Sequence, residues 1–240
     1  MDQVQPLLHD LWLRVRPGDP VRLTGGPLLV VLAVAAAVVG VPALWRVLRV
    51  GVTLVHELGH AMVGLLVGRR FTGFVLRADM SGHAVTSGPV RGLGRGLTTW
   101  AGYPAPALVG AALAWLSGQG WAAPATTLAL LVLLVALVRV RSVLTAVVTV
   151  AATAGVGALW WWRVDQLQAP VLLGVGCVLV VGAWRHLGAV ARRPTASSDP
   201  GVLAQLTRVP AVLWNLSFAV VCALATWLVG LQVWTGLALP

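Results

Sequence analysis

The sequence predicts an all-α polytopic membrane protein of about six to seven transmembrane helices, with a small β-hairpin after the second helix. The 240-residue chain is 58% hydrophobic and 10% charged, with a mean hydropathy of +0.88, whereas soluble domains carry about 25% charged residues. Several apolar runs reach the roughly 20 residues that cross the hydrocarbon core of a bilayer. A polar segment after the second run lacks helical periodicity and contains β-prone residues. These observations exclude an ordinary soluble domain.

The net charge of +10 comes from arginine alone, because the chain has no lysine. The arginines stand singly or in pairs at the ends of apolar runs, which is typical of orientation signals and of contacts with anionic lipid headgroups. We therefore expect the lipid bilayer, and no nucleic acid, as a partner. Arginine without lysine, together with heavy use of Ala, Val, Leu and Gly, indicates a bacterial source.

A single integral membrane domain is expected over residues 1–240, without an internal repeat. Residues 1–26 contain aspartates and arginines, do not resemble a cleavable signal peptide, and are predicted to be a cytoplasmic N-terminal segment. Polar segments 68–96 and 188–208 interrupt the apolar pattern, and the second leads to the last helix. Seven spans are predicted, at residues 27–45, 50–67, 97–117, 125–138, 142–160, 170–187 and 209–235.

The distribution of arginines predicts the orientation of these spans. With the N-terminus inside, fourteen of the seventeen arginines fall on cytoplasmic segments, and only Arg46, Arg49 and Arg163 fall outside. This asymmetry agrees with the positive-inside rule. It predicts a multi-pass protein of the inner (plasma) membrane with a cytoplasmic N-terminus, and it puts both polar segments on the cytoplasmic side. The oligomeric state stays open.

Residues 68–96 are predicted to form the β-hairpin, because β-prone residues flank the turn sequence ADMSG on both sides. Open strand edges are not tolerated against lipid. The hairpin must therefore lie at the membrane interface or inside the helix bundle. An edge strand beside an active site is also a common way to hold an extended peptide.

The stretch TLVHELGHAMVGLL, residues 53–66, places ionisable side chains inside the second predicted span. His56 and His60 are four residues apart and share one helix face, and Glu57, the only glutamate of the chain, lies beside them. In the zincin pattern two such histidines bind zinc and the glutamate is the general base. The alternative is a set of structural polar groups that hydrogen-bond between helices. Because an ionisable group inside a span costs about 2.5 kcal/mol or more, we favour the metal site.

A catalytic zinc site normally has a third protein ligand. The candidates are Asp79, His83, Asp165, His186 and Asp199. Asp79 and His83 flank the hairpin turn, where an aspartate commonly stabilises the turn and a histidine is commonly exposed. Asp165 is expected to form an interfacial ion pair with Arg163, and His186 to anchor the end of a span at the interface.

Asp199 lies in TASSDPGVLAQLTRVP, a polar segment that enters the last span. An aspartate before a proline is a favoured helix N-cap, with the proline at the first helical position. The same carboxylate could also bind the metal, and the residues alone leave both roles open. Gly102, Pro104 and Pro106 in the third span are expected to serve helix packing and a kink rather than to contact the site.

Four motifs together resemble the site-2 protease-like intramembrane zinc metalloproteases, especially their short bacterial branch without a PDZ domain. They are HELGHAMVGLLVG, FVLRADMSGHAVTS, AGYPAPALVGAAL and SDPGVLAQLTRVPAVLW, and the resemblance covers about residues 46–220. It implies that His56, His60 and Asp199 bind Zn²⁺, that Glu57 is the catalytic base, and that the hairpin receives the unwound substrate. Better-known members have an Asn-Pro-containing segment that ends in Asp-Gly, where this chain has Ser-Asp-Pro-Gly.

We therefore predict an intramembrane zinc endopeptidase that cleaves the transmembrane segments of membrane-protein substrates, by means of zinc-activated water with Glu57 as general base. Two alternatives belong to other classes of protein. One is a catalytically inactive membrane scaffold of the same fold, and the other is a small metal or proton transporter. A transporter is expected to carry further ionisable groups along several spans, or an internal repeat, and this sequence has neither.

Overall fold

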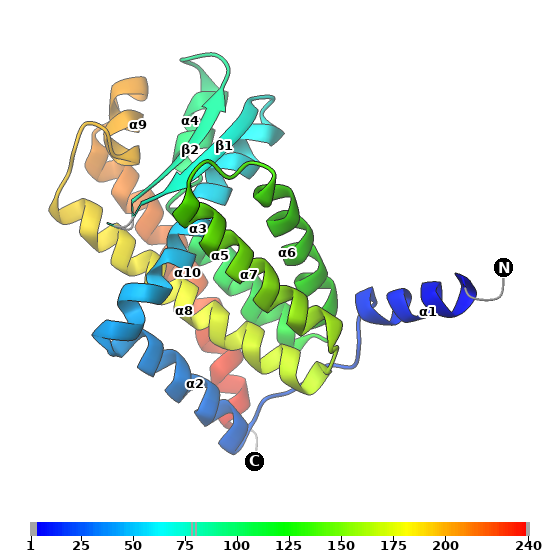
Figure 1. The fold of residues 1–240 in the computed structure, drawn as a ribbon. Coiled ribbons are helices and arrows are strands. Elements are labelled where there is room, and N and C mark those ends of the chain that lie inside the picture. Colours follow the sequence, from blue (N-terminus) through cyan, green and yellow to red (C-terminus); the bar gives the residue numbers. More distant parts are fainter. Residues whose placement is uncertain (1–3, 78, 80, 239–240) are drawn as a thin grey trace.

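The computed structural model describes residues 4–77, 79 and 81–238, which fold into ten helices and one two-stranded antiparallel sheet (Figure 1). The helices and strands are α1 (Val4–Val15), α2 (Gly25–Gly40), α3 (Pro42–Leu66), β1 (Arg70–Leu76), β2 (Gly82–Ser87), α4 (Leu93–Trp100), α5 (Pro104–Gly118), α6 (Ala122–Leu137), α7 (Val143–Trp161), α8 (Asp165–Arg192), α9 (Asp199–Thr207) and α10 (Ala211–Ala238). The predicted fold class is confirmed: the chain is mainly helical, and its hairpin follows the early helices.

Among the described residues, α7, α8 and α10 are each long and apolar enough to cross a membrane. Helices α2 and α3 pass the same test only together, and they are bent by 95° at their break. The break falls at Val41, and Pro42 occupies the first turn of α3, because proline is tolerated in the first turn of a helix but not in its interior. Helices α5 and α6 are apolar but shorter, with 15 and 16 residues. The first two predicted spans therefore correspond to one bent pair of helices.

Small residues let α5 and α8 pack with their backbones in near contact. A Cβ atom added at Gly110 would lie 2.7 Å from the carbonyl oxygen of Gly176, and one added at Gly176 would lie 2.5 Å from that of Gly110. Ala107, Ala114 and Phe218 of the surrounding core are fully buried. Close packing of small residues is the usual basis of helix association in a membrane.

The hairpin is attached to the bundle along the outer edge of β1. The Phe74 amide donates to the Arg139 carbonyl at 3.1 Å, and the Arg141 amide donates to the Phe74 carbonyl at 3.2 Å. The Leu76 amide donates to Thr145 Oγ1 at 2.7 Å. Phe74 and Leu76 are buried against α3 and α6. One edge of the hairpin is thus closed by the connection between α6 and α7, as an edge in a membrane protein requires.

The N-terminal segment lies at the other end of the bundle from the hairpin. The Gly18 amide donates to the Gly120 carbonyl at 2.9 Å, just before α6 begins, whereas Phe74 of the hairpin bonds to Arg139, just after α6 ends. The Arg14 guanidinium lies 4.8 Å from the centroid of the Trp161 ring, at the end of α7. The structure thus puts residues 1–26 and the hairpin at opposite ends of the bundle, whereas the sequence predicted both segments on one side.

The elbow between α2 and α3 also lies elsewhere than predicted. The Arg185 guanidinium of α8 is 4.6 Å from the centroid of the Trp45 ring, so Arg46 and Arg49 lie near Arg185 and not across the membrane from it. The cause is the bend at Val41, which turns α3 away from the direction of α2. A hydropathy pattern reports apolar length, and it does not report such a change of direction.

We predict that residue 19 and residue 91 are accessible from opposite sides of the membrane. Both side chains are exposed, and they belong to opposite ends of the bundle. In a background with Cys177→Ala and Cys222→Ala, single-cysteine variants Asp19→Cys and Arg91→Cys should react with an impermeant maleimide from different sides of sealed vesicles. Labelling of both from the same side would contradict this topology.

Candidate metal centre

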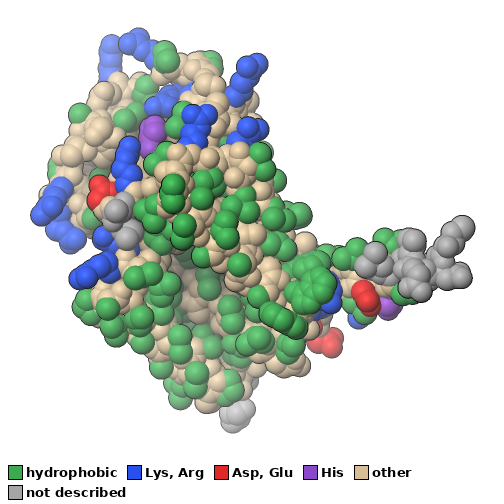
Figure 2. All heavy atoms as spheres, in the orientation of Figure 1, with side chains coloured by type: hydrophobic (Ala, Val, Ile, Leu, Met, Phe, Trp, Pro, Cys, Tyr) green, Lys and Arg blue, Asp and Glu red, His purple; other side chains and the backbone are tan. Residues whose placement is uncertain are grey.

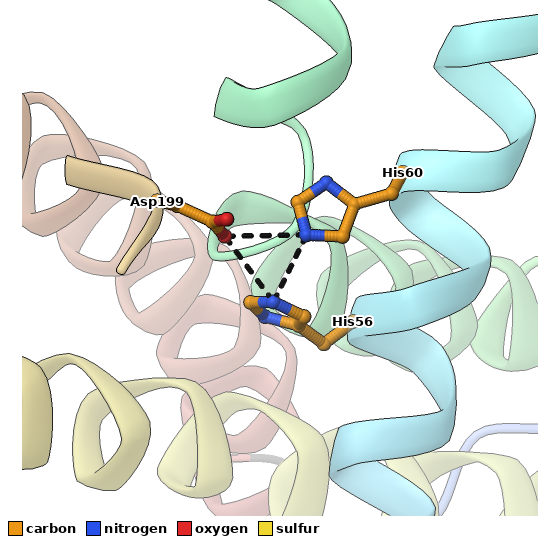
Figure 3. Close-up of side chains that lie close together, drawn as sticks. All are labelled: His56, His60 and Asp199. Carbon is orange, nitrogen blue, oxygen red and sulfur yellow. Dashed lines mark hydrogen bonds and ion pairs between the residues drawn. The ribbon is translucent and has the colours of Figure 1, made fainter. Parts of the chain in front are cut away.

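Three side chains from distant parts of the chain converge between α3 and α9 (Figure 3). His56 Nε2 and His60 Nε2 are 3.1 Å apart. Asp199 Oδ2 lies 3.3 Å from His56 Nε2 and 3.2 Å from His60 Nε2. Within the described residues, no other group of three His, Cys, Asp or Glu side chains is arranged so that it could hold a metal ion. The structure therefore brings together the three residues predicted as ligands.

The geometry of this triangle fits a tetrahedral metal ion. Bonds of about 2.0–2.1 Å to nitrogen or oxygen in a tetrahedral zinc site place neighbouring ligand atoms about 3.3 Å apart. The three edges measured here are 3.1, 3.2 and 3.3 Å. Asp199 Oδ2 is buried and makes no hydrogen bond among the described residues, so its contacts with the imidazoles do not have the angles of a hydrogen bond. The donor set and its spacing thus match zinc with three protein ligands.

A backbone carbonyl orients one of the two imidazoles. His60 Nδ1 lies 2.7 Å from the carbonyl oxygen of Thr98, and since a carbonyl can only accept, Nδ1 carries the proton. In the neutral ring the Nε2 lone pair then points into the triangle, as a metal ligand requires. Thr98 is itself held in α4, where its Oγ1 donates to the Gly94 carbonyl at 2.7 Å.

Glycine at position 102 is needed for the two histidines to approach each other. A Cβ atom there would overlap His60 Nε2 and would lie 2.7 Å from His56 Nε2. Gly59 lies between the two histidines on α3, where a Cβ would overlap Ala105 and approach the Ala101 carbonyl to 2.9 Å. The expectation that Gly102 serves only helix packing is therefore wrong, because its backbone forms one wall of the site.

Asp199 is the first residue of α9, and its carboxylate does not cap the helix. The N-cap is Ser198, whose side chain makes no capping hydrogen bond and instead donates to the Thr195 carbonyl at 2.7 Å. Gln205 closes the same loop by donating from Nε2 to the Ala196 carbonyl at 2.8 Å. This folded loop directs the carboxylate toward α3. Of the two roles left open by the sequence, the geometry favours the ligand over the cap.

The two imidazoles also set the ionisation of Asp199. Burial alone would raise the pKa of its carboxyl group, but the positive charge of His60 in its protonated, metal-free form and the contacts with both imidazoles outweigh burial and lower that pKa well below its usual range. The carboxylate is therefore ionised at neutral pH, which is the form that binds a metal.

Glu57 lies beside the triangle but outside it. Its side chain is buried between α3 and β2, with only 3% of the residue exposed. Gly82 of β2 packs directly on its carboxylate, and a Cβ atom at this position would overlap Oε1. Glu57 Oε2 has no hydrogen-bond partner among the described residues. Glu57 and the three converging side chains line one cavity of about 350 Å³.

The other candidates for a third ligand lie outside the triangle. Asp79 Oδ1 accepts from the Ser81 amide at 2.9 Å and from Ser81 Oγ at 2.7 Å, so its role in the hairpin turn is confirmed. Asp165 forms the expected ion pair with Arg163, at 3.1 Å. His83 is exposed, as expected, at the rim of the cavity.

Two residues at the cavity were not expected there. His186, which was expected only to anchor the end of its span, is partly buried, and its ring centroid lies 6.4 Å from that of His56. Tyr103 meets His56 edge-to-face at 4.9 Å and stacks on Phe218 at 5.2 Å, which restricts the His56 ring. The place of Tyr103 in the motif AGYPAPALVG was an available signal, whereas His186 lay one residue from the end of its predicted span and gave none.

We predict that Gly102→Ala lowers the affinity for zinc by about 10–100-fold, because the added methyl group displaces both imidazoles and perturbed supporting contacts cost about that much. Gly96→Ala is the matched control, since nothing lies within 4 Å of a Cβ atom at position 96. Zinc per chain is measured after dialysis against a competing chelator. Equal zinc retention by the two variants would contradict the geometry described for Gly102.

Comparison with known protein families relates this chain to one of them. The family model for Peptidase M50B-like proteins matches residues 29–229, which include the HELGH motif, the hairpin and Asp199. No curated protein and no solved structure gives a significant match. The match covers most of the chain and agrees with the predicted resemblance. The chain therefore belongs to the Peptidase M50B-like family, the site-2 protease-like membrane metallopeptidases.

Proposed function

We propose that the protein is an intramembrane zinc endopeptidase that cleaves the transmembrane segments of membrane-protein substrates. The observation that carries this proposal is the triangle of His56, His60 and Asp199 ligand atoms, with edges of 3.1–3.3 Å, beside the buried carboxylate of Glu57. Membership of a metallopeptidase family supports the same conclusion independently of the geometry.

His56, His60 and Asp199 would hold the zinc ion. Two nitrogen ligands and one carboxylate oxygen beside an open cavity are the donor set of a catalytic site rather than of a closed structural one. When bound, zinc supplies a water molecule of lowered pKa as the nucleophile and polarises the carbonyl that is attacked. The hydrogen bond between His60 and Thr98 would keep this imidazole in the ligating tautomer.

Glu57 would be the general base. It lies next to a ligand on α3, lines the same cavity, and has a carboxylate oxygen without a hydrogen-bond partner among the described residues. Glu57 would take a proton from the attacking water and return it to the leaving amine. Gly82 allows the hairpin to pack against the side chain and so limits its movement.

Strand β2 would hold the substrate in an extended conformation. The outer edge of β1 is bonded to the connection between α6 and α7, whereas no described backbone group other than β1 bonds to β2. Residues 82–84 of this strand line the cavity that contains Glu57. A transmembrane helix that unwinds near its end can add to such a free edge. Its peptide bonds would then lie beside the general base.

The other classes of function are less well supported. A transporter needs ionisable groups along a path through the bundle, and the described residues contain a single cluster of His, Cys, Asp or Glu side chains that could hold a metal ion. An inactive scaffold would have no need to retain three converging ligands together with the base. Cleavage is the activity that separates these possibilities.

We infer that the end of the bundle with the hairpin faces the bacterial cytoplasm. Arginine side chains gather at this end, over the hairpin and α9, in Figure 2. If each arginine is assigned to the nearer end of the bundle, thirteen of the seventeen belong to the hairpin side, and only Arg14, Arg16, Arg22 and Arg163 belong to the other. The positive-inside rule then puts residues 1–26 outside the cytoplasm. The catalytic site would lie near the cytoplasmic leaflet of the inner membrane.

We predict that Glu57→Gln binds zinc normally but slows cleavage by at least about 10²–10⁴-fold, because an amide cannot accept the proton of the water. Cleavage is measured in proteoliposomes with a panel of single-span reporter proteins, and zinc content is measured on the same samples. Asp79→Asn is the matched control, since it makes the same chemical change in the exposed hairpin turn. Cleavage by Glu57→Gln at the original rate would refute the assignment of the base.

A further inference from the structure

We propose that the elbow between α2 and α3 binds the phosphate of an anionic phospholipid headgroup. An open pocket of about 290 Å³ lies at this elbow, and its lining includes Gly40, Trp45, Arg46, Arg49 and Arg185. It is separate from the metal centre, because Arg49 and His56 are seven residues apart on α3, which is about 10 Å along the helix. The proposal does not depend on zinc or on proteolysis.

The charges around the pocket lack a partner within the described part of the chain. None of the three arginines forms an ion pair there, and Arg49 Nε is buried without a hydrogen-bond acceptor. A buried donor without an acceptor is costly, and three guanidinium groups without a carboxylate repel one another. Arg185 is held over the Trp45 ring at 4.6 Å, which fixes it beside the pocket. A bound anion would accept a hydrogen bond from Arg49 and would offset the repulsion among the three guanidinium groups.

The start of α3 adds to the attraction for an anion. Val41 is the N-cap of this 25-residue helix and offers no side-chain capping bond. The free amide groups of the first turn therefore carry a partial positive charge at the elbow. Together with the three guanidinium groups, they form a site for a group with several acceptor oxygens, and guanidinium binds phosphate oxygens in pairs.

The position of Arg185 along α8 places this site at headgroup depth. α8 begins at Asp165, directly after the exposed Trp161 and Trp162, and tryptophans of this kind mark a membrane interface. Arg185 follows twenty residues later, which is roughly 30 Å along the helix and equals the thickness of the hydrocarbon core. The three arginines therefore lie at the second interface, where lipid phosphates are concentrated.

The apolar surface beside the pocket favours a lipid over free phosphate. Leu44, Val47 and Leu48 lie three and four residues apart on the first two turns of α3 and are 43%, 64% and 45% exposed. They form the face of the helix that turns away from Trp45 and Arg49. A lipid can contact both faces, with its headgroup at the arginines and its acyl chains along the apolar side chains. Inorganic phosphate would contact only the arginines and would gain nothing from the apolar side chains.

The test compares lipid binding by the purified full-length protein and two double variants with the same loss of charge. Native mass spectrometry from detergent measures retention of phosphatidylglycerol and of phosphatidylcholine. We expect the original protein to retain phosphatidylglycerol preferentially, and Arg49→Gln with Arg185→Gln to weaken this binding by about 10–30-fold. The control, Arg192→Gln with Arg193→Gln at the end of α8, should change it by less than about twofold.

Three results would overturn the proposal. They are equal losses in both double variants, equal retention of the two lipids, and displacement of phosphatidylglycerol by millimolar inorganic phosphate, which would indicate a site for the free anion. If the cluster variant fails to fold, Arg46→Gln replaces it, since this side chain is exposed. That single change should weaken phosphatidylglycerol binding by about fivefold, and unchanged binding would equally refute the proposal.

Discussion

The cost of burying ionisable groups among apolar helices governs the structure of this protein. His56, His60 and Asp199 place three ligand atoms within 3.3 Å of one another, and their side chains are only 12–20% exposed. Removing such groups from water costs several kcal/mol each unless protein groups or a metal ion replace the lost hydration. Asp199 Oδ2 and Glu57 Oε2 nevertheless lack hydrogen-bond partners among the described residues. A dication between the ligands would offset this cost, and the surrounding elements are arranged to leave room for it.

Glycine makes that arrangement possible at several points. Gly59 and Gly102 let the start of α5 approach α3, and Gly82 lets β2 pack against the Glu57 side chain. At Gly110 and Gly176 the backbones of α5 and α8 come into near contact behind the site. In each case a single added carbon would collide with an atom of the site or with a neighbouring backbone. Helix packing and site geometry therefore depend on the same small residues, so that a substitution that disturbs the packing also disturbs the site.

Local pattern predicted the helical fold, the hairpin and the shared face of His56 and His60, because periodicity and turn residues act over a few positions. The expectation that Asp199 is a ligand came from family resemblance, since its approach to α3 depends on the folded segment at residues 195–205. The sequence did not predict that the N-terminal segment and the hairpin lie at opposite ends of the bundle, because the 95° bend between α2 and α3 leaves no trace in hydropathy. The position of His186 beside the site was missed because its neighbours depend on how α8 crosses α3, which hydropathy does not report either.

X-ray absorption spectroscopy of the zinc-loaded protein tests the central claim most directly, because it reports the ligands without requiring a substrate. The account predicts a first shell of nitrogen and oxygen atoms alone, at about 2.0–2.2 Å, with the outer-shell scattering of two imidazoles. Asp199→Ala should lose one oxygen ligand and keep both imidazoles. Sulfur at about 2.3 Å, scattering from fewer than two imidazoles, or a spectrum unchanged in Asp199→Ala would contradict a site built from His56, His60 and Asp199.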